Sequence, residues 1–311
     1  MHVDGSLRAT TYGLPCSVHM DPIEKKPLFH FLPGTGIFSV ATVGCNLHCR
    51  NCQNDSISQA NPEDVPAYEA MPEQLIETAL EAGAKSIAYT YTEPLVFYEY
   101  TLESCRLAQE RKLNNVLVTA GFINNPPLRE LLPYVDAANV DLKAFNDKFY
   151  KDNCDGSLRP VLQSLETFVE MGVWLEITNL IIPTLNDGMK EIGQMCKWIR
   201  DTLGPDVPLH FSRFHPHHRL TNLLPTPAET LENARDLALD TGLRHVYVGN
   251  LRSRQGEHTF CPNSDCSEAG QALVRRNGYR IVENRLNHGC CPICNTPVAG
   301  LWEQPDAKEN Q

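Results

Sequence analysis

Three cysteines, Cys45, Cys49 and Cys52, lie within eight residues directly after an apolar run over residues 37–43. Thiolates at this spacing can close on one metal centre, and soft sulfur ligands select zinc, copper(I) or an iron-sulfur cluster. A 4Fe-4S cluster takes one thiolate for each iron. Three cysteines therefore leave one iron open to another ligand, which indicates a reactive site.

The alternative for the same loop is a zinc knuckle in which His48 supplies the fourth ligand. Closed zinc sites normally pair two separated ligand clusters, whereas this loop is a single cluster. The spacing therefore favours the iron-sulfur interpretation.

The pattern Cys45-x3-Cys49-x2-Cys52 after a short strand resembles the cluster loop of the radical S-adenosylmethionine superfamily. Residues 21–34, with residues 53–54 and 57–59 after the loop, are similar to the radical enzyme of the AmmeMemoRadiSam system, which itself resembles the pyruvate formate-lyase activating enzymes. The resemblance extends over residues 21–300. It implies that S-adenosylmethionine chelates the open iron through its amino and carboxylate groups. Reductive cleavage then gives methionine and a 5'-deoxyadenosyl radical.

Two positions depart from the pattern of that superfamily. Asn51 stands before the third cysteine, where an aromatic residue usually packs near the adenine. Glu93 lies in a segment similar to the Gly-Gly-Glu-Pro that holds the amino group of the cofactor, but Tyr91 and Thr92 replace both glycines. The resemblance therefore implies that Glu93 binds the cofactor while the backbone around it differs. A solvated glutamate at a strand end is the alternative.

The length and net charge of the chain limit the kinds of fold and of partner that the sequence allows. The chain has 311 residues, enough for one large α/β domain and a small module, and a formal net charge of -11. That charge opposes general attraction to phosphate backbones, so no nucleic-acid partner is expected. The sequence shows neither a signal peptide nor an apolar run of about 18 residues, so no membrane partner is expected. Clustering among the twelve cysteines favours metal binding in a reducing, cytoplasmic compartment over disulfides.

The order of predicted elements indicates an α/β fold. Residues 1–36 are interpreted as a non-regular arm, residues 37–250 as the core, and residues 251–311 as a small module with a polar tail. Strands are predicted over residues 37–43, 86–91, 115–119, 138–142, 174–182, 209–214 and 245–248. Helices between them begin near Pro72 and, with a capping box at Thr226 and Glu229, near Pro227. Strands alternating with helices fit the partial (β/α)6 TIM-like barrel of the resembled superfamily, although periodicity alone is equally compatible with a doubly wound sheet.

Polar residues stand where the predicted strands end, the edge at which such folds carry their chemistry. Asp141 and Lys143 share one face of the fourth strand by period two. A carboxylate beside an ammonium suits a zwitterionic ligand, and the resemblance places the pair near the methionine carboxylate; a structural ion pair is the alternative. Further candidates are Thr119 and Asn179 for the cofactor and His215 for proton transfer, whereas His217 and His218 are interpreted as exposed loop residues.

The carboxyl-terminal segment carries a second cysteine pattern, Cys261-x4-Cys266 followed by Cys291-x2-Cys294. Two thiol pairs at this separation are typical of a zinc ribbon or rubredoxin-like site, with a structural zinc or mononuclear iron. An auxiliary iron-sulfur cluster that includes Cys290 is the alternative. A strand hairpin is predicted around Asn277-Gly278. Removal of this module is expected to leave the cluster loop intact.

Two classes of function follow. The first is a radical S-adenosylmethionine oxidoreductase, similar to the enzymes that install glycyl radicals, acting on a protein, peptide or small molecule. It would need an external low-potential electron donor and would work with companion proteins of the AmmeMemoRadiSam system. The second is an electron-transfer or interaction protein with closed cysteine sites and no turnover.

Overall fold

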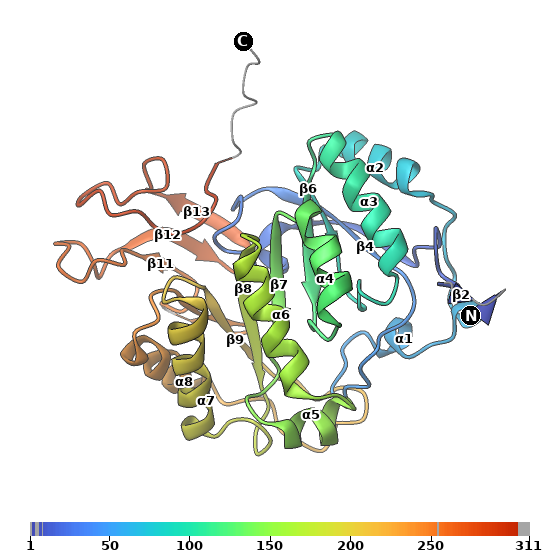
Figure 1. Cartoon of the computed structure of the whole chain (residues 1–311). Helices are drawn as coiled ribbons and strands as arrows, with labels where there is room; N and C mark the ends of the chain where they lie inside the picture. Colours follow the sequence, from blue (N-terminus) through green and yellow to red (C-terminus); the bar gives the residue numbers. More distant parts are fainter. Residues whose placement is uncertain (1, 4–5, 8, 254, 304–311) are drawn as a thin grey trace, which may run out of the picture.

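The computed structural model describes residues 2–3, 6–7, 9–253 and 255–303, so the predicted polar tail lies outside the described residues from residue 304 onward. Its centre is an eight-stranded sheet with the order β10-β9-β8-β7-β6-β5-β4-β3 (Figure 1). β3 is antiparallel to β4, and each later neighbour is parallel. The strands are β3 (Ser17–Pro22), β4 (Gly36–Ala41), β5 (Ser86–Tyr89), β6 (Asn114–Thr119), β7 (Ala137–Asp141), β8 (Trp174–Ile181), β9 (Leu209–Arg213) and β10 (Val246–Gly249). β1 (His2–Val3) and β2 (Ser6–Leu7) pair as a separate two-stranded antiparallel sheet.

Consecutive strands are neighbours throughout the parallel part of the sheet, and helices connect them. A doubly wound sheet would reverse the strand order at a switch point, and this sheet has no reversal among the described strands. The partial barrel is confirmed, and its seven parallel strands, β4 to β10, correspond to the seven predicted strand ranges. The helices are α1 (Asp55–Ser58), α2 (Pro72–Glu81), α3 (Tyr98–Glu110), α4 (Asn125–Leu131), α5 (Asp147–Cys154), α6 (Leu158–Glu170), α7 (Met189–Trp198) and α8 (Ala228–Thr241).

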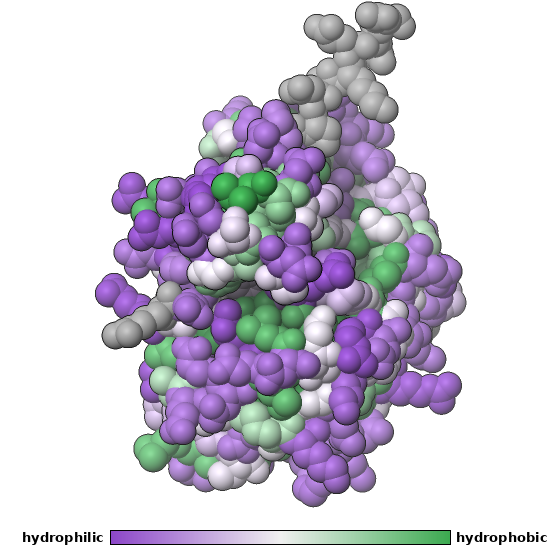
Figure 2. Space-filling view, turned by 90° about the vertical axis from the view of Figure 1, so that its left-hand side faces the viewer, coloured by the Kyte–Doolittle hydropathy of each residue, from purple (hydrophilic) through white to green (hydrophobic). Residues whose placement is uncertain are grey.

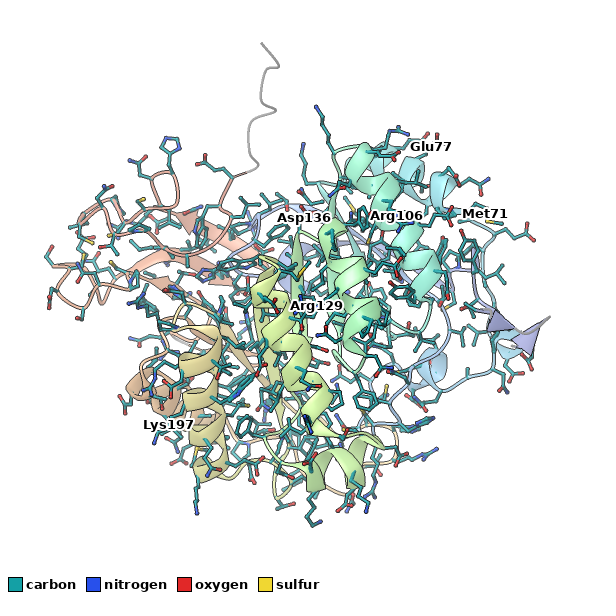
Figure 3. The ribbon with its side chains drawn as sticks, viewed as in Figure 1. Met71, Glu77, Arg106, Arg129, Asp136 and Lys197 are labelled. Carbon is teal, nitrogen blue, oxygen red and sulfur yellow. The ribbon has the colours of Figure 1, made fainter. Side chains whose placement is uncertain are left out.

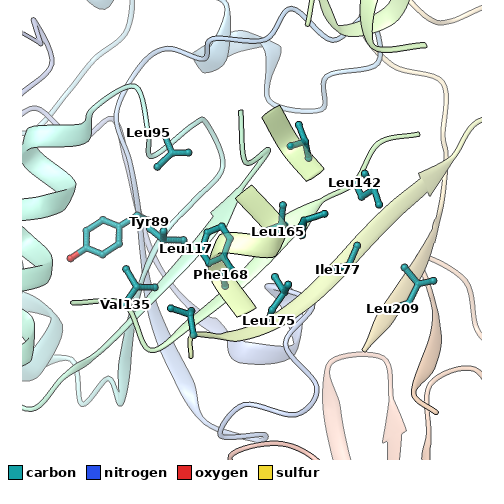
Figure 4. Packing of buried hydrophobic residues seen from close by; sticks show 14 of the residues in the cluster. Tyr89, Leu95, Leu117, Val135, Leu142, Leu165, Phe168, Leu175, Ile177 and Leu209 are labelled. Carbon is teal, nitrogen blue, oxygen red and sulfur yellow. The ribbon is translucent and has the colours of Figure 1, made fainter. Parts of the chain in front are cut away.

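The main core lies between the sheet and its helices. Figure 4 shows this packing, with Leu165 and Phe168 of α6 against Leu117, Leu175 and Ile177 of the strands. Leu231, Ala234 and Ala238 of α8 are buried as their spacing predicts. On the solvent side, ion pairs join Arg129 to Glu170 and Arg106 to Glu130, and both arginines are labelled in Figure 3. Exposed pairs of this kind contribute little to stability.

The predicted capping box at Thr226 is wrong. The Thr226 hydroxyl donates to the Ile181 carbonyl oxygen (2.6 Å) and accepts from the Phe214 amide (3.0 Å), so it joins the ends of β8 and β9 instead of capping α8. The helix begins at Ala228, after Pro227, and ends at Thr241, where Gly242 caps it with a φ of 106°. A buried hydroxyl that satisfies two backbone groups contributes more to stability than an exposed helix cap does.

The arm over residues 1–36 is not irregular, because it contains β3, which pairs with β4 along its whole length. Farther along, Ile23, Leu28 and Phe31 are fully or almost fully buried against the inner face of the sheet, where they contact a cluster that includes Ala88 and Val116. The arm therefore fills part of the barrel interior, and apolar residues without a clear period gave no sign of it.

The carboxyl-terminal module is a three-stranded antiparallel sheet of β11 (Thr259–Phe260), β12 (Ala272–Asn277) and β13 (Arg280–Asn284). The predicted hairpin is confirmed: Asn277 pairs with Arg280 across Gly278, which has a φ of 59°. Figure 2 views the molecule from the side of this module and shows hydrophobic residues near the middle of that face with hydrophilic residues around them. None of the described helices is long and apolar enough to cross a membrane.

The module is attached to the arm by buried contacts. The Leu32 amide donates to the Leu301 carbonyl oxygen, and the Leu301 amide donates to the His30 carbonyl oxygen. Both hydrogen bonds are 2.7 Å long. The buried Arg276 guanidinium lies over the Phe29 ring, 4.3 Å from its centroid, and donates to the Phe29 carbonyl oxygen (2.8 Å). Because these arm residues also fill the barrel, loss of the module should disturb the arm, whereas the expectation that its removal leaves the cluster loop intact stays a prediction.

Candidate functional site

The cysteine loop follows β4 at the carboxyl edge of the sheet, where parallel α/β folds place their chemistry. Gly44 makes the turn into the loop with a φ of 115°, a conformation that side chains disfavour. Its amide donates to the Ile57 carbonyl oxygen (3.0 Å), and its carbonyl accepts from the Glu93 amide (3.3 Å). Leu47 is 1% exposed and anchors the middle of the loop.

The far side of the loop lies on the end of α5. The His48 amide donates to the Cys154 carbonyl oxygen, and the Arg50 amide donates to the Asn153 carbonyl oxygen. Both hydrogen bonds are 2.9 Å long. The Asn51 side-chain oxygen accepts from the Asn153 amide group (2.8 Å), so the residue that departs from the aromatic pattern is held by α5. These contacts fix the loop without using its sulfurs.

Cys45, Cys49 and Cys52 all line one cavity of about 460 Å³. They do not form a set of sulfurs within 4.8 Å of one another, whereas four other cysteines of the described chain do. A single zinc ion with bonds of about 2.3 Å would bring its sulfurs within about 4 Å. His48, the fourth ligand of the zinc alternative, is exposed and outside the lining of the cavity. The wider set of cavity-lining sulfurs suits a larger cluster better than one ion.

Glu93 is 1% exposed and lies in the same cavity. One carboxylate oxygen accepts from the Thr119 hydroxyl (2.6 Å) and the Leu95 amide (3.2 Å), and the other accepts from the Ala120 amide (2.8 Å). Burial raises the pKa of the Glu93 carboxyl, and these donors oppose that shift. A carboxylate has about four acceptor positions, so one is left for an ammonium group. Thr119 is brought to the site as a support for Glu93.

Asp141 and Lys143 form an ion pair of 3.0 Å, and both line the cavity, so the prediction that they share a face is confirmed. Burial lowers the pKa of Lys143, but Asp141 and the Cys49 sulfur outweigh that effect and raise it well above its usual value. The ammonium is thus held charged between a carboxylate and a cysteine of the loop. This is the arrangement that a zwitterionic ligand beside the loop requires.

Tyr91 keeps a glycine-like backbone at the position where the resembled segment has glycine, with a φ of 63°. Left-handed backbone costs a tyrosine roughly 1–2 kcal/mol. The Tyr91 hydroxyl donates to Asp21, which also binds the buried Lys26 ammonium at 2.7 Å. Although burial opposes it, Lys25, Lys26 and Tyr91 hold the pKa of Asp21 well below its usual range. The arm is therefore fastened to the cavity wall at the strained residue.

Two predicted site residues do not reach the cavity. Asn179 is buried on the helix side of β8, where its side chain donates to the Leu142 carbonyl oxygen (2.7 Å). Its strand neighbours Thr178 and Leu180 line the cavity instead, because successive residues of a strand point to opposite faces. His215 is exposed in the loop after β9 and does not line the cavity. The structure thus gives neither residue the predicted role.

The interpretation of His217 and His218 as exposed loop residues is confirmed for His217, whereas the His218 side chain is only 17% exposed. Both rings lie 3.0 Å from the carboxylate of Asp55, at the start of α1. The Arg219 amide donates to the Arg50 carbonyl oxygen (3.0 Å). The loop after β9 is therefore bound to the cysteine loop. No local signal reveals this, because the partners are far apart in the sequence.

The carboxyl-terminal cysteines form the candidate metal centre of the module. Cys261, Cys266, Cys291 and Cys294 place their sulfurs within 4.8 Å of one another, with Cys261 and Cys294 3.5 Å apart. Cys290 is not a member of this set, which leaves the auxiliary-cluster alternative without support. All twelve cysteines lie in the described part of the chain, and none is in a disulfide. Four thiolates at these separations suit one tetrahedral ion and close its coordination.

Replacing Glu93 by glutamine should weaken binding of the cofactor about tenfold to a hundredfold, because one charged contact contributes on the order of 1.5–3 kcal/mol. Iron content should stay unchanged, since Glu93 is not a thiolate ligand. Equilibrium binding of S-adenosylmethionine to the reconstituted protein measures the effect. Glu99→Gln, at an exposed position on α3, is the matched control. Equal affinity in both variants would make Glu93 a structural residue only.

Comparison with known proteins gives concordant matches. The family model described as the Radical SAM superfamily matches residues 39–199. An uncharacterized protein of Methanocaldococcus jannaschii is 43% identical, over 96% of this chain and 87% of its own length. The pyruvate formate-lyase-activating enzyme of Clostridium pasteurianum is 25% identical, over 54% of this chain and 71% of its own.

Solved structures agree on the fold. A radical SAM methyltransferase from Sphaerobacter thermophilus superposes with a TM-score of 0.56 at 18% identity, covering 71% of this chain and 68% of that protein. SuiB of Streptococcus suis, bound to S-adenosylmethionine, also gives 0.56, at 11% identity over 74% of this chain and 53% of its own.

Proposed function

The chain belongs to the radical S-adenosylmethionine superfamily, and we propose that it cleaves S-adenosylmethionine reductively at a 4Fe-4S cluster held by Cys45, Cys49 and Cys52. The observation that supports this most is the meeting of three thiols, a buried carboxylate and an Asp-Lys pair in one cavity. A protein with closed cysteine sites and no turnover has no use for such a cavity. The alternative of a pure electron carrier is therefore less well supported.

The cluster, when bound and reduced by an external low-potential donor, supplies the electron that breaks the bond between sulfur and the 5' carbon of the cofactor. Glu93 binds the ammonium of the methionine half, with Thr119 holding the carboxylate in place. Lys143 attracts the carboxylate of the same half, and Asp141 orients Lys143. The cofactor, once cleaved, would take up a hydrogen atom at its 5' carbon from a C–H bond of the substrate.

The relationship to activating enzymes supports a finer proposal, hydrogen abstraction from a protein or peptide in a reducing cytoplasm. Within the superfamily, residues 21–34, 53–54 and 57–59 support assignment to the AmmeMemoRadiSam group and its companion proteins. Zinc or a single iron in the module has a structural role, because four thiolates leave no open position.

Anaerobic incubation of the reconstituted protein with dithionite and S-adenosylmethionine tests the proposal. Formation of 5'-deoxyadenosine and methionine in equal amounts is the expected result. A protein with a full complement of iron and sulfide that forms neither product, with or without cell extract, would refute it.

A further inference from the structure

His210 occupies the inner face of β9 and lines the cavity. In the sheet register Asp141 is opposite Thr178, and Thr178 is opposite His210, so the three residues form one row across β7, β8 and β9. Two strand spacings separate His210 from Asp141 by about 10 Å along this row. The imidazole thus lies in the same row as Asp141, two strands away from it.

The buried carboxylate of Glu176 fixes the orientation of this imidazole. It accepts from the backbone amides of Phe29 (3.0 Å) and His30 (2.8 Å) and from the Trp174 indole (3.1 Å). A carboxylate surrounded by donors accepts one more from His210 Nε2, which lies 2.7 Å away. The proton of the neutral ring is therefore on Nε2, and Nδ1 is the acceptor.

Nδ1 of His210 makes no hydrogen bond within the described chain, and it is not one of the buried side-chain atoms that lack a partner. It is therefore open to the cavity. His30 offers a contrast nearby, because both of its ring nitrogens bind protein atoms, the Ala299 carbonyl oxygen and the Tyr247 hydroxyl. The His210 ring is also fixed by edge contact with Phe29 (4.9 Å) and stacking on Tyr247 (5.0 Å).

We propose that His210 Nδ1 binds the substrate by accepting a hydrogen bond from an uncharged O–H or N–H group, and that Glu176 is the residue that positions it. The proposal rests on the proposed function, since it assigns the substrate part of the same cavity. The substrate class that fits is one with a hydroxyl or amide group close to the carbon that loses hydrogen.

Two substitutions distinguish the roles of the two ring nitrogens of His210. Glutamine places its amide nitrogen as many bonds from the backbone as Nε2, so His210→Gln keeps the donor to Glu176 and loses the acceptor. Asparagine places its amide oxygen as many bonds away as Nδ1, so His210→Asn keeps the acceptor and loses the donor. His288→Gln, at a side chain that is 84% exposed, is the control.

Deuterium transfer reports hydrogen abstraction without knowledge of the substrate. Each variant is incubated with S-adenosylmethionine and extract from cells grown in deuterated medium, and deuterium in 5'-deoxyadenosine is measured by mass spectrometry. His210→Gln should lower the deuterated fraction about tenfold, the effect of one hydrogen bond of about 1.4 kcal/mol. Total 5'-deoxyadenosine and iron content should stay unchanged, and His210→Asn should retain more transfer than His210→Gln. Undiminished transfer by His210→Gln, or equal losses in both variants with lowered melting temperatures, would overturn the proposal.

A second measurement does not depend on turnover. Diethyl pyrocarbonate modifies imidazole nitrogens that are unprotonated and accessible, so peptide mapping should find His288 and His210 modified and His30 unmodified. If the protein without substitutions took up no deuterium from any extract, hydrogen abstraction would be refuted. The labelling experiment would then be the test of whether His210 Nδ1 is open to the cavity. A His210 that stays unlabelled while His288 is fully labelled would overturn the assignment of an open Nδ1.

Discussion

Alanine at any one of Cys45, Cys49 or Cys52 removes the iron of the loop and abolishes formation of 5'-deoxyadenosine. Three thiolates hold the proposed cluster, and the described cavity offers no other thiol in its lining to replace a lost one. The loss should be of about four iron atoms per chain. Iron and sulfide analysis of the reconstituted variants, followed by the anaerobic cleavage assay, measures both effects. Metal in the carboxyl-terminal module should remain.

Cys290→Ser is the control for this prediction, because Cys290 is outside both groups of cysteines. Its iron content and cleavage should equal those of the unmodified chain. Retained cleavage in the triple alanine variant would contradict the assignment of the loop, and loss of iron in Cys290→Ser would restore the auxiliary cluster.

Replacement of Cys291 by serine destabilises the whole protein rather than the module alone. The Cys291 side chain is 1% exposed and is one of four sulfurs placed for a single ion. Binding of zinc contributes about 10–16 kcal/mol of apparent folding free energy in zinc-finger peptides, as much as the total stability of many domains. When the module unfolds, Leu32 loses its hydrogen bond to Leu301, and Phe29 loses its contact with Arg276.

Hydrogen exchange measures how far that destabilisation spreads. The Leu32 amide and the amides of β3 should exchange faster in Cys291→Ser than in Cys290→Ser, and the melting temperature should fall. Unchanged protection of the Leu32 amide would show that the module is independent of the arm. The sequence does not reveal this coupling, because contacts between residues 30 and 301 leave no trace in local composition.

Regular periodicity made the parallel sheet predictable. Each predicted strand overlaps an observed one, and Asp141 and Lys143 are on the predicted face. Cysteine spacing identified both cysteine groups, because metal ligands close in sequence require specific intervals. These features depend on residues within a few positions of one another.

Features that depend on distant partners could not be predicted. Asn179 and Thr178 are neighbours of similar polarity, and only the register with β7 determines which faces the cavity. His215 was predicted because it follows a strand, and no local pattern pointed to His210, whose orientation comes from the carboxylate of Glu176 on another strand. Thr226 matched a capping box, yet its hydroxyl forms hydrogen bonds with the Ile181 carbonyl oxygen and the Phe214 amide. In each case a tertiary contact prevailed over a local pattern.

Electron paramagnetic resonance of the reduced protein, before and after addition of S-adenosylmethionine, shows whether the cofactor binds an open iron of a cluster in the cysteine loop. If the loop holds a 4Fe-4S cluster with one iron open to the cofactor, the g values of the reduced cluster must change when the cofactor binds that iron. We expect such a change in the unmodified chain and a smaller one at the same cofactor concentration in Glu93→Gln. A signal from a fully loaded cluster that saturating cofactor leaves unaltered would contradict the account.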